Sequence, residues 1–274
     1  MGVWTSRAAA WLGAVLLGAV VASHAAAQDD AATQRGDNER LAREVQNPFS
    51  DLITVPFQNT ANFGYSPENG LQNVLNIQPV VPVPIAKSWE ILARPILPVS
   101  YSSVPSSEFG LGDVNLEAIL SPTASPDLEW GVGVVLSAPT ASRESLGWGK
   151  WTAGLVIGVY RELERWTWSL VVTQQWSYAG DRHRDSVSFL QISPGLNYNF
   201  DDGWYATFAP PVSADFSIHR GQQWLVPLGA GLGKLFPIGR QSLSVSLEGY
   251  WSVIHPSGGP RATAVFTVTL VFPE

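Results

Sequence analysis

An apolar residue recurs at every second position through most of this chain, from residue 50 to its end, and this pattern limits the folds open to it. Between Trp89 and Tyr101, seven successive residues of one face are apolar, while the other face carries Glu90 and Arg94. A period of two residues indicates a β-strand, since an amphipathic helix has a period of 3.6. Such a strand fits either a half-buried sheet of a soluble protein or a membrane barrel with lipid outside and a polar lumen.

The number and length of these segments favour the barrel. Twelve can be counted, an even number, and most are 10 to 14 residues long. Strands of globular proteins usually have about 5 or 6 residues, whereas a tilted strand needs about 9 to 11 to cross the bilayer hydrocarbon. Short connections also alternate with longer polar ones, as periplasmic turns and extracellular loops do. The sequence therefore predicts an all-β fold, an antiparallel transmembrane β-barrel of about twelve strands. We expect the strands at residues 53–65, 71–83, 89–101, 111–121, 129–138, 149–160, 166–178, 187–200, 204–217, 223–236, 241–254 and 261–272.

The tryptophans give an independent indication. Ten of the twelve follow residue 27, and most lie at predicted strand ends. Indole rings prefer the boundary between headgroups and hydrocarbon, so two aromatic bands are typical of an outer-membrane barrel. Core filling in a soluble sandwich is the alternative, but it would not place tryptophan at strand ends. We expect Trp89, Trp130, Trp166, Trp168 and Trp204 on the side of the short turns, and Trp148, Trp151, Trp176, Trp224 and Trp251 on the other.

Prolines inside the predicted strands oppose a regular barrel, because each removes a hydrogen bond from the ladder. Bulges or local breaks in pairing would accommodate them. The six are Pro79, Pro95, Pro98, Pro194, Pro210 and Pro227.

The chain begins with the pattern of a secretory signal peptide. Arg7 precedes an apolar run from Ala8 to Ala22, and Ala25 and Ala27 form a small-residue cleavage site. A transmembrane anchor is the alternative, but it needs about 20 apolar residues. We therefore expect residues 1–27 to be a secretory signal peptide. Together with the predicted barrel, it places the chain in the outer membrane of a Gram-negative bacterium.

Residues 28–47 differ in composition from the rest, being rich in Asp, Gln, Arg and Ala. Residues 39–46 could form two helical turns before the break at Asn47-Pro48. We expect a polar, exposed N-terminal segment, with a docked helix or a plug as the alternative. Residues 48–274 then form the barrel.

Charge and cysteine content exclude several classes. Charged residues make up 14% of the chain, against roughly 25% in soluble domains, as expected if half of each strand faces lipid. The formal net charge is −7, and it becomes −8 once residues 1–27, with Arg7, are removed. An acidic protein of this kind is not a nucleic-acid binder by charge. The absence of cysteine excludes a disulfide scaffold.

Several segments are distinctive in combination. They are Asn47–Asn59 (NPFSDLITVPFQN), Asn76–Val80 (NIQPV), Arg94–Pro98 (RPILP), Gly110–Asp113 (GLGD), Trp176–Asp181 (WSYAGD), Asn197–Tyr198, Gly203–Tyr205, Pro227–Lys234 (PLGAGLGK) and Leu270–Glu274 (LVFPE). In these segments the chain resembles the meta-pathway phenol-degradation family of outer-membrane β-barrels, whose members are also labelled transporter or neuromedin U. The resemblance covers nearly all of residues 47–274 and places prolines inside strands. It implies an outer-membrane protein that helps hydrophobic or aromatic compounds to pass, and it carries over no catalytic residue.

If the apolar faces contact lipid, the opposite faces line the lumen. Five acidic residues and one clearly basic residue lie there, so a water-filled lumen would weakly favour cations. Internal salt bridges and a hydrogen-bonded plug are the alternative. Gly229, Gly231 and Gly233 share one inward face, and leave either a groove or room for close packing. The lumen-lining candidates are Glu90, Arg94, Asp113, Asn115, Glu117, Asn197, Asp215, Glu248 and Tyr250.

A barrel phospholipase is the enzymatic alternative, because a Ser and His pair can lie at the outer rim. Ser257 near His255 and Ser186 near His183 are the pairs available, and His219 is the remaining histidine after the signal. None of them lies in a distinctive motif, and no cluster has the spacing of a metal site.

We therefore expect a passive channel or uptake protein for small molecules, hydrophobic or aromatic ones included, and not an enzyme. A structural barrel with a blocked lumen is the second hypothesis. No catalytic residue, cofactor or metal is expected. The expected partners are outer-membrane lipid, a small-molecule solute and the outer-membrane assembly machinery, with no nucleic acid.

Overall fold

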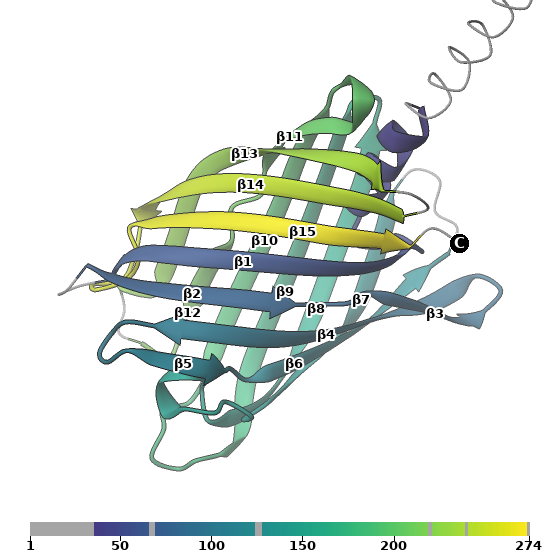
Figure 1. Cartoon of the computed structure of the whole chain (residues 1–274). Helices are drawn as coiled ribbons and strands as arrows, with labels where there is room; N and C mark the ends of the chain where they lie inside the picture. The colour runs from purple at the N-terminus through teal and green to yellow at the C-terminus, as the bar shows by residue number, and fades with distance from the viewer. Residues whose placement is uncertain (1–35, 66–68, 124–127, 219–220, 239–240, 273–274) are drawn as a thin grey trace, which may run out of the picture.

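A computed structural model describes residues 36–65, 69–123, 128–218, 221–238 and 241–272, and shows a closed antiparallel β-barrel (Figure 1). The predicted signal peptide and His219 lie outside the described residues. The strands are β1 (Ile53–Tyr65), β2 (Gly70–Ile77), β3 (Val81–Ala86), β4 (Trp89–Ser102), β5 (Glu108–Leu111), β6 (Val114–Pro122), β7 (Glu129–Ala138), β8 (Lys150–Leu163), β9 (Trp166–Gly180), β10 (Ser188–Asn199), β11 (Trp204–Phe208), β12 (Val212–Asp215), β13 (Trp224–Ile238), β14 (Gln241–Ile254) and β15 (Ala262–Phe272). Two 3₁₀ turns are η1 (Glu144–Leu146) and η2 (Asp201–Gly203), and residues 36–45 are helical.

These fifteen strands occupy twelve positions around the barrel. Strands β2 and β3 pair with one side of β4, and β5 and β6 pair with its other side. Strands β11 and β12 both lie between β10 and β13. The first and last strands pair from Ile53↔Phe272 to Phe63↔Ala262, which closes the ring. The twelve predicted segments are thereby confirmed.

Ile53 and Phe272 lie at one end of the barrel, with the short turns between β3 and β4, between β8 and β9, and at η2. Short turns mark the periplasmic end of such barrels, so we call this the periplasmic end. The longer connections lie at the opposite, extracellular end (Figure 1).

The in-strand prolines coincide with the interruptions that split three of the twelve positions. Pro79 lies between β2 and β3, and Pro210 lies between β11 and β12. Pro194 lies on β10 between the residues paired with β12 and those paired with β11. Pro227 follows a register shift against β14. Local breaks and one bulge therefore accommodate prolines that an unbroken ladder would exclude.

Pro98 shows how the ladder is repaired at one break. Its carbonyl accepts a hydrogen bond from the Gly112 N–H at 2.9 Å, but proline has no N–H to return. The Gly112 carbonyl accepts from the Thr140 hydroxyl at 3.3 Å instead. A Cβ on residue 112 would lie 2.9 Å from Pro98 Cγ, so the close approach requires glycine.

The outside of the barrel is apolar. Leu155 is 61% exposed, Ile157 56% and Leu247 61%, although all three lie within long strands. Exposed tryptophans lie toward both ends, as the two predicted aromatic bands require. Soluble monomers rarely expose continuous apolar surface of this extent, so the outer surface is the lipid-facing one. The exposed tryptophans are Trp130, Trp166 and Trp204 toward the periplasmic end, and Trp151, Trp176, Trp224 and Trp251 toward the other.

Trp148 differs from the predicted band. It lines the interior and its ring lies 5.5 Å from that of Phe189. The backbone N–H of Trp148 donates to Asp113 at 2.6 Å, which fixes the loop in this inward position. A residue at a strand end can follow its loop, so the alternation of the neighbouring strand does not determine its face.

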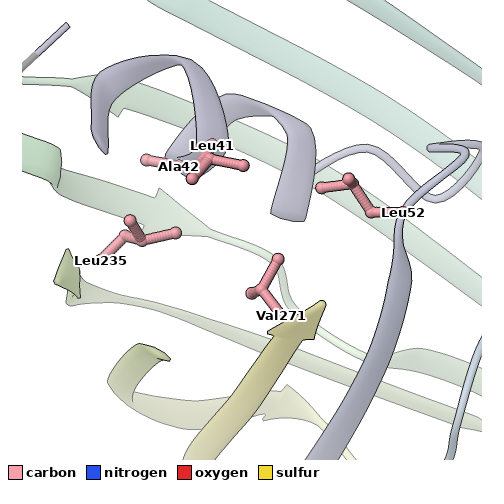
Figure 2. Packing of buried hydrophobic residues seen from close by; sticks show 5 residues of the cluster. All are labelled: Leu41, Ala42, Leu52, Leu235 and Val271. Carbon is pink, nitrogen blue, oxygen red and sulfur yellow. The ribbon is translucent and has the colours of Figure 1, made fainter. Parts of the chain in front are cut away.

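The N-terminal helical segment packs against the periplasmic end of the barrel (Figure 2). Leu41 and Ala42 of the helix are buried with Leu52, Leu235 of β13 and Val271 of β15. Burial of these side chains holds the segment in place through the hydrophobic effect. Residues 36–45 therefore dock as a helix, as in the alternative considered above, while residues 28–35 lie outside the described residues.

Within the described part of the chain, no helix is both long and apolar enough to cross a bilayer.

Candidate functional site: the barrel lumen

The barrel encloses a cavity of about 580 Å³. Forty residues line it, and 24 of them have polar side chains, mostly carboxamides and hydroxyls. Because side chains alternate between the two faces of a strand, the apolar exterior and this polar interior arise from the same sequence pattern. Five of the predicted lumen residues line the cavity: Arg94, Asn115, Glu117, Asn197 and Glu248.

Arg94 and Glu117 lie opposite each other on β4 and β6 and form an ion pair. Arg94 Nε donates to Glu117 Oε2 at 2.9 Å, and Arg94 Nη2 donates to the same oxygen. Glu117 is almost fully buried, so the pair places little net charge in the lumen. The salt-bridge alternative raised above describes this pair.

Glu248 has a different environment on the other side of the cavity. Its carboxylate accepts a hydrogen bond from the Tyr250 hydroxyl, which itself accepts from the Ala209 N–H at 3.3 Å. Among the described residues, no arginine, lysine or histidine forms an ion pair with it. Tyr250 is buried and orients this carboxylate.

The three inward glycines of β13 leave room for the side chains of neighbouring strands on this side of the cavity. A Cβ on Gly231 would lie 2.5 Å from Glu248 Cγ, and one on Gly233 would collide with the Tyr205 ring. The Tyr205 hydroxyl lies 3.0 Å from Ser244 Oγ. The glycines therefore serve close packing by the barrel's own side chains, and do not form an empty groove.

Besides Tyr250, three predicted lumen residues are absent from the cavity lining. Asp113 accepts from the Ala141 N–H at 3.0 Å and from the Trp148 N–H, and so holds the extracellular loop that contains η1. Asp215 accepts from the Ser217 N–H at 2.9 Å at the same end. Glu90 is 4% exposed at the periplasmic end and is absent from the cavity lining. Each lies near a strand terminus, where the alternation still holds but the lumen gives way to turns and loops.

The N-terminal segment supplies lumen residues that the sequence analysis did not identify. Gln46 Nε2 donates to Asn199 Oδ1 at 2.8 Å, and Thr167 Oγ1 donates to Gln46 Oε1 at 2.6 Å. Asn197 Nδ2 donates to Thr167 Oγ1 at 3.0 Å and extends this network. Asn47 Nδ2 donates to Glu129 Oε2 at 2.6 Å. These bonds tie the segment to β7, β9 and β10, so it narrows the periplasmic mouth.

Two further contacts anchor the helix to β8. The Tyr160 hydroxyl donates to the Arg43 carbonyl at 3.1 Å, and Arg43 Nε lies 2.5 Å from Glu162 Oε1. Leu41 and Val45 lie four residues apart in the helix, and this apolar spacing is a sequence signal by which the docked face could have been found.

The Phe49 ring packs against the inner face of β7 and β8, over a glycine of each strand. Gly131 and Gly158 are paired across these strands. A Cβ on Gly131 would lie 2.8 Å from the Phe49 ring, and a Cβ on Gly158 would lie 2.7 Å from it. Phe49 is 4% exposed and packs with Leu92 and Ile119. The paired glycines thus form a socket for one aromatic ring of the N-terminal segment.

Truncating this ring should release the segment. Removal of a buried phenyl group costs about 3 to 5 kcal/mol, so we expect Phe49→Ala to speed tryptic cleavage after Arg43 in the folded, detergent-solubilised barrel. Phe63→Ala is the control, since Phe63 is 45% exposed on the outer surface. Equal cleavage rates in the two variants would show that the socket does not hold the segment.

The imidazole rings of His183 and His255, at the extracellular rim, contact oxygen atoms of groups other than serine hydroxyls. His183 Nδ1 lies 3.1 Å from Asp181 Oδ1, and His255 Nδ1 lies 2.9 Å from the Pro256 carbonyl oxygen. The pKa of Asp181 lies below its usual value, chiefly because its carboxylate accepts a hydrogen bond from the His183 backbone N–H. Within the described ranges, no serine hydroxyl bonds to either ring, and no group of three or more metal-ligand side chains converges.

A closed antiparallel ring of twelve positions, apolar outside and polar inside, defines an outer-membrane β-barrel of the Gram-negative type. No protein-family model matches the chain, and no curated protein matches its sequence. Among solved structures, an outer membrane channel from Pseudomonas putida F1 is similar, with a TM-score of 0.61 and 17% identity over 81% of this chain and 94% of that one. The NanC porin is similar too, with a TM-score of 0.51 and 7% identity over 81% of this chain and 100% of that one. At these identities the similarity concerns the fold.

Proposed function

We propose that this protein is a passive outer-membrane channel for small molecules. The observation that carries the proposal is the 580 Å³ cavity, lined mainly by polar side chains inside a barrel with an apolar exterior. Water-filled porin lumens have this character. The similar folds named above belong to proteins described as a channel and a porin, which supports the proposal. Solute and outer-membrane lipid are its proposed partners, with the outer-membrane assembly machinery for insertion.

Planar-bilayer recording of the purified barrel is the direct test. We expect discrete conductance steps, and liposome swelling with small neutral sugars, because a polar lumen exchanges water and small solutes without a bound substrate. A protein that is folded, inserted and silent in both assays would contradict a channel.

The N-terminal contacts favour a second candidate, a barrel whose lumen is blocked at its periplasmic mouth. Gln46, Asn47 and Phe49 all occupy that mouth. The two candidates differ in the wild-type protein, which is silent if the segment blocks the lumen and conducts if it only narrows it.

We also propose that the chain belongs to the meta-pathway phenol-degradation family, because it carries the segments quoted above. This membership implies that the solutes are hydrophobic or aromatic compounds.

A hydrolytic role is not proposed. An esterase assay on the wild-type barrel and on His183→Ala and His255→Ala would reveal one, as activity that either substitution abolishes.

A further inference from the structure

We infer that Glu248 sets the charge preference of the lumen, so that small neutral and cationic solutes pass in preference to anions. The inference rests on the proposed channel function. It names both a selectivity-determining residue and a substrate class.

The first step is the balance of charges around the cavity. Its charged lining residues are Glu44, Arg94, Glu117 and Glu248. Glu44 pairs with Arg40, and Glu117 pairs with Arg94. Within the described part of the chain, Glu248 is the cavity-lining carboxylate without an ion pair. The uncompensated charge of the lumen is therefore negative.

The second step is the position of that carboxylate. Glu248 is half-buried, and Gly231 next to it on β13 leaves room for its side chain against the wall. The hydrogen bond from Tyr250 holds the carboxylate in one place. A fixed charge in a narrow lumen acts on every permeant ion, as charged rings do in ion channels.

The third step is the chemistry of the remaining lining. Carboxamides and hydroxyls replace the water of a neutral polar solute, through side chains such as Gln58, Asn76, Gln175, Gln191 and Asn197. Arg94, the guanidinium among the lining residues, is occupied by Glu117, so the described lining offers an anion no free cationic side chain.

The test is the permeability ratio of K⁺ to Cl⁻, from reversal potentials in a salt gradient across a planar bilayer. We expect the wild-type barrel to prefer K⁺ by about threefold or more, and Glu248→Gln to bring the ratio close to one. Glu248→Asp keeps the charge and should retain the preference. Glu117→Gln should shift the ratio toward Cl⁻, because it frees Arg94. Glu108→Gln, a partly exposed residue at the extracellular rim and outside the cavity lining, is the control and should leave the ratio unchanged.

Two failures are distinguishable. Channels that conduct with the same ratio in the wild type and in Glu248→Gln would overturn the inference and leave the channel intact. If the wild type is silent, the proposed channel function fails for the intact protein, and the inference is tested in the variant lacking residues 36–46. Silence of that variant, or a ratio that Glu248→Gln leaves unchanged in it, would overturn the inference as well.

Discussion

Deleting residues 36–46 should raise the single-channel conductance several-fold. This segment contains the helix and Gln46, and it narrows the periplasmic mouth. Its removal takes away the bonds from Gln46 to Asn199 and Thr167, and the contact of Arg43 with Glu162. Water then fills the space that the segment occupied, so the lumen widens at its periplasmic mouth and ions pass through it more easily.

The measurement is single-channel recording, with heat-modifiable gel migration as a check that the variant barrel is folded. Asp37→Ala is the control, because Asp37 is an exposed residue of the same helix and should leave conductance unchanged. A deletion variant that folds but conducts like the wild type would show that ions do not pass the segment. If the variant fails to fold, Gln46→Ala with Phe49→Ala tests the same point in a chain of full length.

The twelve positions of the barrel were predictable because each depends on many residues at once. Seven alternating residues from Trp89 to Tyr101 identify a strand even where Pro95 and Pro98 lie within it. The faces of Arg94, Glu117 and Glu248 followed from the same alternation. A one-residue error in register would move a whole face to lipid, so a strand of this kind has one acceptable register.

Features that depend on single contacts could not be predicted in the same way. The ion pair of Arg94 with Glu117 needs the register between β4 and β6, which no pattern within one strand specifies. Asp113 serves loop N–H groups instead of the lumen, since loop geometry determines its partners. The socket for Phe49 needs two glycines of different strands to be paired. Pairings of this kind join residues far apart in the chain.

A charge on the outer surface should be among the most damaging substitutions in the barrel. Leu155 lies within β8, is 61% exposed, and has Val134 and Gln174 as its neighbours across the sheet. Arginine on the lipid face near the bilayer midplane costs about 2 to 4 kcal/mol, and about 0 to 1 kcal/mol near the interface. At an exposed site of a soluble protein the same change would stay within about 0.5 kcal/mol. The size of the effect therefore reports which solvent the outer surface contacts.

We expect Leu155→Arg to lower the free energy of unfolding by about 2 to 4 kcal/mol, from guanidinium titrations of the barrel in lipid vesicles followed by tryptophan fluorescence. Leu163→Arg is the matched control, because Leu163 ends the same strand at the periplasmic side and is 45% exposed. Its cost should stay below about 1 kcal/mol, since the guanidinium there can reach the headgroups. Equal costs at the two positions would mean that the bilayer midplane does not lie at Leu155, and near-zero costs at both would contradict a lipid-facing outer surface.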